Sequence, residues 1–301
     1  MKLIHFINLI RWKNLLLLLL IQVLLKFVLF PKFNISFAID TFHFFILSSA
    51  TLLITAGGYI INDYYDIKTD AINKPNKAIV ENFISKRTSI FFYVSITLIG
   101  LFLGIYISFY IDLPILSFLF VLVATTLFFY SSIFKRIALI GNITVALLIA
   151  LSIILIPIFD VIPVLNDKQI VEQLLLIKIV LIYSCFAFFI NLIREIIKDI
   201  EDVDGDYSQG MKTLPIILGK KRTIKFTVFL TVLYTILVVF TLALNQNINK
   251  YLLLYGIMTI TIPLIIFLVK LNGAESKKAF SKLSSLLKII MLTGILTILF
   301  I

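Results

Sequence analysis

Long apolar segments recur along this chain and constrain its fold more than any other feature. Nine of them approach the roughly 20 residues that a helix needs to cross a bilayer, at 13–30, 41–61, 88–110, 113–130, 139–158, 172–197, 224–244, 250–270 and 283–301. The 301 residues are 61% hydrophobic and 14% charged, which is too apolar for a water-soluble core. The sequence therefore predicts an all-α integral membrane protein, a bundle of about nine transmembrane helices around a central cavity, forming one polytopic membrane domain over residues 1–301.

The Lys and Arg residues divide unequally between the two sides that these spans define. Most lie in the N-terminal segment and in the loops after the second, fourth, sixth and eighth spans. An excess of Lys and Arg marks the cytoplasmic side of a membrane protein. We therefore expect a protein of the cell (inner) membrane with its N-terminus and these loops in the cytoplasm. This topology accounts for the net charge of +11 without a nucleic-acid partner.

Two acidic clusters follow apolar segments on that same side and lie far apart in the sequence. The first belongs to a motif at 62–77 and the second to a motif at 194–219. In the first cluster, Asn62, Asp66 and Asp70 are spaced i, i+4, i+8. In the second cluster, Asp199, Asp202 and Asp206 are spaced i, i+3, i+7. Residues at such spacings share one face of a helix, so each cluster is predicted to present its side chains in one direction.

Carboxylates that share a face at membrane depth repel one another and need compensation by cations or protons. Side-chain cations are available, because Arg194 and Lys198 flank the second cluster. Oxygen ligands without Cys or paired His favour a hard metal ion, Mg²⁺ ahead of Mn²⁺ or Ca²⁺. Two such faces across a cavity are suited to hold a diphosphate through Mg²⁺.

The stretch NDYYDIKTDAINKP at 62–75 resembles the first aspartate-rich motif of the UbiA-type intramembrane prenyltransferases, and REIIKDIEDVDGDYSQGMKTLPIILG at 194–219 resembles their second. This resemblance implies a nine-helix bundle and Mg²⁺-dependent transfer of a prenyl group from a polyprenyl diphosphate of the geranylgeranyl type. The second motif looks most similar to members that form digeranylgeranylglyceryl phosphate. That similarity implies a lipid-soluble membrane acceptor such as geranylgeranylglyceryl phosphate.

The resemblance also implies roles for individual residues. The metal ligands would be Asn62, Asp63, Asp66, Asp199, Asp202 and Asp206. The catalytic residues would be Asp66, Asp70, Lys135 and Asp199. The substrate-binding residues would be Arg11, Asn14, Lys74, Lys77, Tyr130, Arg194 and Lys198. Lys135 lies in YSSIFKR, which resembles the family loop whose lysine meets the diphosphate, and Asp70 would take the proton of a hydroxyl acceptor.

Other functions stay open from the sequence. Prenylation of an aromatic acceptor, a quinone or chlorophyll precursor, is one alternative, since such prenyltransferases share parts of the second motif. A cation-coupled transporter is an alternative of another class, because intramembrane acids also mark ion pathways. An enzyme that forms an allylic cation needs dry, aromatic walls. The candidates for those walls are Phe186–Phe189, Tyr59, Tyr64, Tyr65 and Tyr130.

Overall fold

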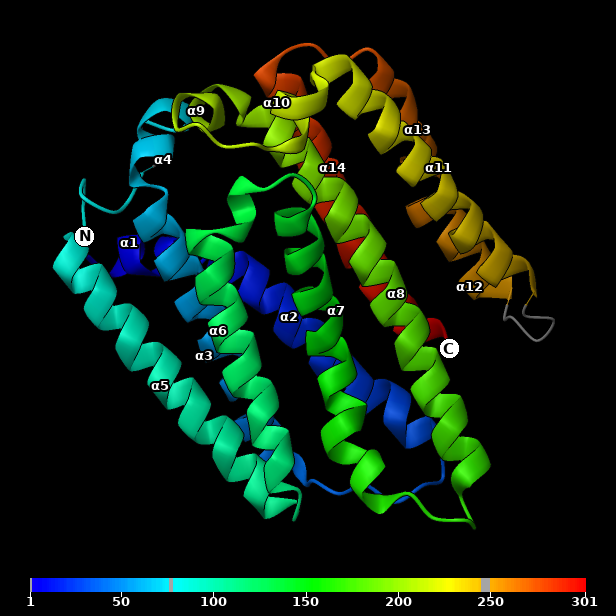
Figure 1. Ribbon diagram of the computed structural model, residues 1–301. Coiled ribbons are helices and arrows are strands. Elements are labelled where there is room, and N and C mark those ends of the chain that lie inside the picture. The colour runs from blue at the N-terminus through cyan, green and yellow to red at the C-terminus, as the bar shows by residue number, and fades with distance from the viewer. Residues whose placement is uncertain (1, 76–77, 245–249) are drawn as a thin grey trace.

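The computed structural model describes residues 2–75, 78–244 and 250–301, and these residues form helices joined by turns and short loops (Figure 1). Within these ranges nine helical segments are long and apolar enough to cross a membrane, which confirms the predicted bundle. They are Trp12–Lys32, Thr41–Tyr65, Lys86–Tyr110, Pro114–Ser132, Ile140–Val164, Ile170–Glu201, Lys220–Ala243, Lys250–Asn272 and Lys277–Phe300.

The α-helices are α1 (Lys2–Leu9), α2 (Trp12–Leu24), α3 (Thr41–Tyr65), α4 (Ile67–Asn73), α5 (Lys86–Tyr110), α6 (Ser117–Ser132), α7 (Ile140–Asp160), α8 (Ile170–Glu201), α9 (Val203–Ser208), α10 (Leu214–Leu218), α11 (Lys220–Leu244), α12 (Lys250–Gly256), α13 (Ile262–Asn272) and α14 (Lys277–Leu296). Short 3₁₀ or π turns extend or join them at Leu25–Leu29, Phe30–Lys32, Pro114–Leu116, Phe134–Arg136, Ile162–Val164, Ile257–Thr261 and Thr297–Phe300.

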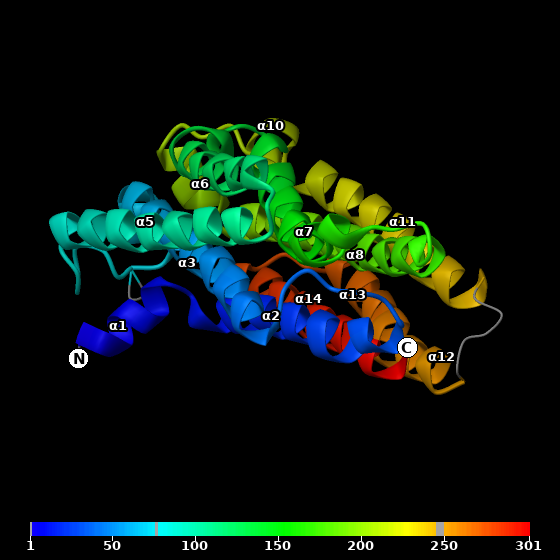
Figure 2. The same ribbon diagram turned by 90° about the horizontal axis from the view of Figure 1, so that it is seen from below.

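The long helices form a ring around a central cavity of about 520 Å³. α3 packs against α2, α5 and α6, α7 packs against α8, and α8 packs against α14, which returns to α2. α11 and α13 pack against each other outside α8 and α14. Figure 2 shows α2 and α14 on one side of the bundle and α5, α7 and α8 on the other. The predicted central cavity is therefore present.

Large apolar side chains cover the outside of the ring. Phe102 on α5, Phe118 on α6 and Ile236 on α11 are 69%, 61% and 59% exposed. Such a surface would be strongly unfavourable in water, whereas lipid solvates it at little cost. The helices therefore face lipid outward and keep their polar groups for the interior and the bundle ends.

Short helices gather at one end of the bundle, where α4 packs against α9 (Figure 1). Asn73 at the end of α4 donates a hydrogen bond to the carbonyl of Asp202 (2.8 Å) and accepts one from the backbone N–H of Gly205 (3.0 Å). A Cβ at Gly205 would lie 2.4 Å from the Asn73 amide nitrogen, so the absence of a side chain permits this contact. Two segments that are distant in sequence are thereby held together.

A buried ion pair joins elements at the other end of the bundle. Lys26 and Asp160 lie 2.7 Å apart, and the Asp160 side chain is 0% exposed. The same carboxylate accepts a hydrogen bond from the N–H of Ile39 (3.0 Å), and the Lys26 ammonium donates to the Ile39 carbonyl (2.8 Å). Both charges are therefore paired and hydrogen-bonded, which is what buried ions require.

We expect Gly104→Ala to lower the free energy of unfolding by about 1–3 kcal/mol, because overpacking a filled interface costs this much. A Cβ at Gly104 would lie 2.4 Å from the ring of Phe120, which is itself buried. Gly273→Ala is the matched control, since a Cβ there meets nothing within 4 Å. Thermal unfolding in detergent measures both variants. A midpoint for Gly104→Ala at or above that of the wild type would contradict the packing of α5 on α6.

Candidate active site between the two acidic motifs

A polar cavity of about 580 Å³ lies where α3 meets α4 and α8 meets α9. Its walls bring together most of the residues that the sequence singled out. The lining residues among them are Arg11, Asn62, Asp63, Asp66, Asp70, Lys74, Tyr130, Lys135, Lys198, Asp199, Asp202 and Asp206. The two acidic motifs therefore share one cavity. Asn14 and Arg194 line the adjoining central cavity instead, and Lys77 lies outside the described residues.

Each motif places its middle carboxylate at the junction of two helices. Asp66 (φ −87°, ψ 1°) separates α3 from α4, and Asp202 (φ −102°, ψ 10°) separates α8 from α9. The sequence spacing predicted that each cluster lies on one helix face, and that interpretation is wrong, because neither cluster sits on a single continuous helix. The carboxylates nevertheless line the same cavity, because α4 docks on α9.

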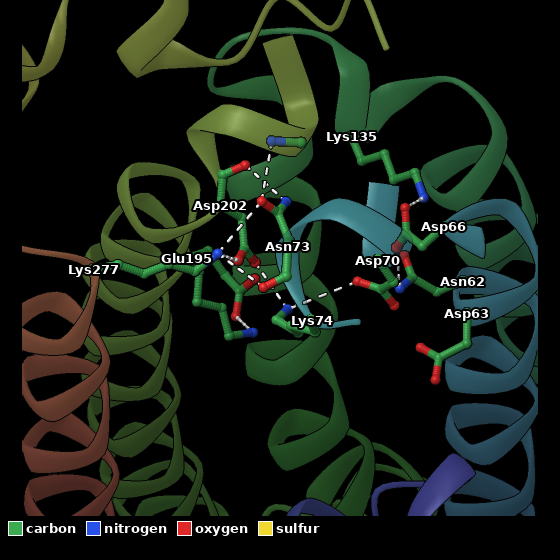
Figure 3. Close-up of polar contacts among 12 residues, drawn as sticks. Asn62, Asp63, Asp66, Asp70, Asn73, Lys74, Lys135, Glu195, Asp202 and Lys277 are labelled. Atoms are coloured by element: carbon green, nitrogen blue, oxygen red, sulfur yellow. Dashed lines mark hydrogen bonds and ion pairs between the residues drawn. The ribbon is translucent and has the colours of Figure 1, made fainter. Parts of the chain in front are cut away.

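Asp66 is held by an amide and an ammonium group. Asn62, one turn earlier on α3, donates a hydrogen bond to it (2.7 Å), and Lys135 forms an ion pair with its other oxygen (Figure 3). Lys135 lies in the 3₁₀ turn before α7 and is 8% exposed. A Cβ at Gly141 would lie 2.7 Å from the Lys135 Cα, so the glycine lets α7 approach the turn that carries this lysine.

Lys74 links the two motifs directly. Its ammonium lies 2.9 Å from Asp202 and 4.0 Å from Asp70 (Figure 3). Lys277, at the start of α14, lies 4.0 Å from Asp202 Oδ1 and donates to the carbonyl of Asn73 (2.9 Å). Asp202 Oδ1 is buried and has no hydrogen-bond partner among the residues that the structure describes. Two lysines therefore surround a carboxylate that still has one unsatisfied oxygen.

The remaining carboxylates have different partners. Asp199 accepts a hydrogen bond from Asn142 on α7 (2.8 Å). Asp63 forms an ion pair with Arg11 (2.8 Å), which directly precedes α2 in the turn after α1. The guanidinium of Arg11 also lies 4.9 Å from the ring of Tyr59. The sequence grouped these acids together, whereas the structure gives each its own hydrogen-bonding environment.

Glu195 has two cationic neighbours, since it lies 2.6 Å from Lys198 and 3.1 Å from Arg194. Sequence reasoning missed its importance, although the i, i+3 spacing to Lys198 signals this pair. It also missed Asn73, Asn142, Lys277 and Lys288. Asn73 lies inside the first motif but was given no role there, whereas Asn142, Lys277 and Lys288 lie in α7 and α14, outside both motifs.

Burial and neighbouring charges shift the pKa values of groups in this cavity. Burial, followed by the charge of Asp66, raises the pKa of Asp70 to about 6. Burial, followed by the charge of Asp202, raises the pKa of Asp206 to about 7. Burial acts to lower the pKa of Lys74, but the carboxylates Asp202 and Asp70 outweigh it and the pKa is raised. The acidic groups are thus incompletely compensated, and a bound cation would be favoured here.

The donor chemistry of the cavity fits a hard cation. Its walls offer carboxylate oxygens, and one of them, Asp202 Oδ1, is buried without a hydrogen-bond partner in the described part of the chain. Within residues 2–75, 78–244 and 250–301, no three His, Cys, Asp or Glu side chains converge on one point as a preformed metal site. Mg²⁺ commonly keeps water and substrate phosphate oxygens as ligands, so it suits such an incomplete protein shell.

The polar cavity adjoins the central cavity. Arg11, Asn62, Tyr130, Glu195 and Lys198 line both. Beyond these residues the central cavity is lined mainly by Leu, Ile and Val side chains of the surrounding helices. A charged chamber therefore shares a wall with an apolar one, an arrangement suited to a ligand with an anionic head and a hydrocarbon tail.

The aromatic residues proposed as walls divide into two groups. Tyr59, Tyr130 and Phe186 line the central cavity. The others, Tyr64, Tyr65, Phe188 and Phe189, are not among its lining residues.

Comparisons with known proteins agree with this architecture. The model of the UbiA prenyltransferase family matches residues 16–289. The digeranylgeranylglyceryl phosphate synthase of Korarchaeum cryptofilum is 32% identical over 244 residues, which are 81% of this chain and 80% of that relative. The enzyme of the same name from Saccharolobus solfataricus is 31% identical over 247 residues, 82% of this chain and 80% of the relative.

Solved structures give the same fold. One, described as a study of digeranylgeranylglyceryl phosphate synthase in membranes, has 25% sequence identity and a TM-score of 0.63, and the match covers 99% of this chain and 97% of that one. A UbiA homolog from Archaeoglobus fulgidus bound to DMAPP and Mg²⁺ has 18% identity and a TM-score of 0.62, covering 98% and 99%. Since the family match includes both acidic motifs and curated relatives cover most of its length, this chain belongs to the UbiA prenyltransferase family.

Proposed function

We propose that this protein transfers a prenyl group of the geranylgeranyl type from a polyprenyl diphosphate to a membrane lipid acceptor that carries a glycerol phosphate. The observation that carries this proposal is the wall shared by the polar and central cavities. A prenyl diphosphate has a highly charged head and an apolar tail. The head fits the carboxylate- and lysine-lined chamber, and the tail fits the central cavity, whose volume lies in the range of about 300–1,000 Å³ typical of ligand pockets.

The metal would be held at the polar cavity. Mg²⁺ would bind through Asn62, Asp63, Asp66, Asp199, Asp202 and Asp206, together with diphosphate oxygens. When bound, it would neutralise the negative charge that grows on the leaving diphosphate. Lys74 and Lys135 line the same cavity and would add positive charge for that purpose. The solved A. fulgidus homolog, which is described as bound to DMAPP and Mg²⁺, supports the use of a prenyl diphosphate together with this metal.

The reaction exchanges one C–O bond for another. The bond between the first carbon of the prenyl chain and the diphosphate oxygen breaks, and its electron pair leaves with the diphosphate. A lone pair of the acceptor hydroxyl forms the new bond to that carbon, and the hydroxyl proton passes to Asp70. Tyr59, Tyr130 and Phe186 line the cavity that would keep water from the allylic centre.

Two further observations support the acceptor class and the orientation. The curated relatives are named digeranylgeranylglyceryl phosphate synthases, and a product of that name follows from adding a second geranylgeranyl group to a glyceryl phosphate that already carries one. The loops rich in Lys and Arg include those beside α4, α9 and α10, the end that holds the polar cavity. By the positive-inside rule this end faces the cytoplasm.

Replacing the carboxylates of the polar cavity tests the proposal. We expect Asp66→Asn and Asp206→Asn to lower kcat/KM by about 10²–10³, because each removes charge that would hold the metal–diphosphate group. Asp204→Asn is the matched control, since Asp204 is an exposed aspartate of the same α9 that lines neither cavity. The assay follows labelled geranylgeranyl diphosphate into geranylgeranylglyceryl phosphate in detergent. Near-wild-type transfer by both cavity variants would refute the metal role.

Removing divalent ions tests the cofactor. EDTA should abolish transfer and added Mg²⁺ should restore it, whereas the detergent-solubilised protein should keep its size-exclusion profile. The fold is expected to survive because Lys74 and Lys135 already compensate Asp202 and Asp66. Transfer that persists after exhaustive chelation would contradict the proposed chemistry.

Filling the central cavity tests the placement of the tail. Ala187 lines this cavity and lies eight residues, about 12 Å along α8, from Glu195. We expect Ala187→Phe to lower kcat/KM for geranylgeranyl diphosphate at least about tenfold while dimethylallyl diphosphate still binds, because only the longer tail reaches the added ring. Leu181→Phe, on an exposed part of the same helix, is the control. Equal losses for both donors would place the tail elsewhere.

A further inference from the structure

Cationic side chains outnumber carboxylates at the polar end of the central cavity. Arg11, Arg194, Lys198 and Lys288 line it, and Glu195 is the one carboxylate among its lining residues. These cations come from four places in the fold, namely the α1–α2 junction, two turns of α8, and α14. Such an excess inside an apolar chamber is costly unless an anion balances it.

Pairing within the protein removes only part of this excess. Asp63 neutralises Arg11, and Glu195 is shared by Arg194 and Lys198. Lys288 donates to the amide oxygen of Asn14 (3.2 Å), which is a neutral partner. Among the residues 2–75, 78–244 and 250–301, two positive charges at this cavity therefore remain without a carboxylate of their own.

Arg194 and Lys288 are the two cations whose positive charge is not fully compensated. Arg194 is 8% exposed, and its Nε is buried with no hydrogen-bond partner from any described residue. Lys288 lines the same cavity as Arg194 and Arg11, and its hydrogen-bond partner is the neutral amide of Asn14. A buried guanidinium with an unpartnered N–H and an ammonium that line one cavity are a donor set that favours phosphate oxygens.

We propose that Arg194 and Lys288, supported by Arg11 and Asn14, form a binding site for the phosphate monoester of the lipid acceptor. The inference rests on the proposed function and adds where the acceptor head group binds. A phosphate monoester near neutral pH carries close to two negative charges, which match the two uncompensated cations. The acceptor phosphate would then be held by side chains alone, apart from the carboxylates proposed to bind the donor through Mg²⁺.

The position of this site suits the reaction. Arg194 lies one helical turn, about 6 Å, from Lys198, which lines both cavities. An acceptor anchored at Arg194 and Lys288 therefore has its glycerol hydroxyl close to the junction at which the donor head and tail meet. Its hydrocarbon chain can lie in the central cavity or extend toward lipid.

The test compares two acceptors that differ only in the phosphate, geranylgeranylglyceryl phosphate and dephosphorylated geranylgeranylglycerol. We expect Lys288→Gln and Lys288→Met to raise KM for the phosphorylated acceptor about 10- to 100-fold, the range for loss of a charged hydrogen bond. KM for the neutral acceptor and Kd for geranylgeranyl diphosphate should change by less than about twofold. Lys288→Arg should restore most of the affinity. Lys282→Gln, an exposed lysine of the same α14, is the matched control.

The outcomes separate the two hypotheses. Size-exclusion profiles and thermal midpoints first identify which Lys288 variants are folded, and at least one neutral variant with a wild-type midpoint is used. An unchanged KM for the phosphorylated acceptor in that variant overturns the site. So does a matching rise in the donor Kd, because these cations would then bind the diphosphate. If the wild type transfers to neither acceptor, the proposed function fails, and the acceptor site falls with it.

Discussion

The docking of α4 on α9 is the contact on which the polar cavity depends. Asn73 bonds two backbone groups of the second motif, and Gly205 leaves room for it to do so. Lys74 then reaches Asp202 across the same interface. Without this contact, the two acidic segments would be separate charged loops at the ends of different helices. With it, repelling carboxylates are held in one chamber and are compensated by lysines from three parts of the chain.

Polar groups are concentrated at one end of the ring and hydrocarbon at its centre. This separation follows from solvation, since charges near the bundle end can be reached by water and ions, whereas charges at the bilayer midplane are costly. A transporter would be expected to bind its ion near that midplane, often in helices interrupted by Gly or Pro. The observed distribution instead fits an amphiphilic substrate that spans the boundary between the two chambers.

Most of the architecture could be predicted from the sequence, because spanning helices depend on local composition. All nine predicted spans correspond to helices within the described residues, and the acidic motifs do meet. The spacing argument failed at Asp66 and Asp202, because at each of these residues one helix ends and the next begins. An argument from residue spacing assumes an uninterrupted helix, so it does not detect a helix end between the residues that it compares.

The contacts of single polar residues were also hard to predict from the sequence. Asn142 and Lys288 acquire their partners only through tertiary packing, so nothing in their immediate sequence distinguishes them. The ion pairs of Glu195 were easier to predict, since its cationic neighbours Arg194 and Lys198 are close to it in the sequence.

The lysine–carboxylate pairs have a consequence for the cycle of ligand entry and release. Lys74 and Lys135 occupy carboxylates that the proposed reaction assigns to metal binding. These two ammonium groups keep the carboxylates paired in the protein without ligand. If a divalent ion bound to Asp66 and Asp202, it would take over this charge compensation, and the two ammonium groups would be available to phosphate oxygens. The total charge of the chamber would then stay close to balance with and without substrate.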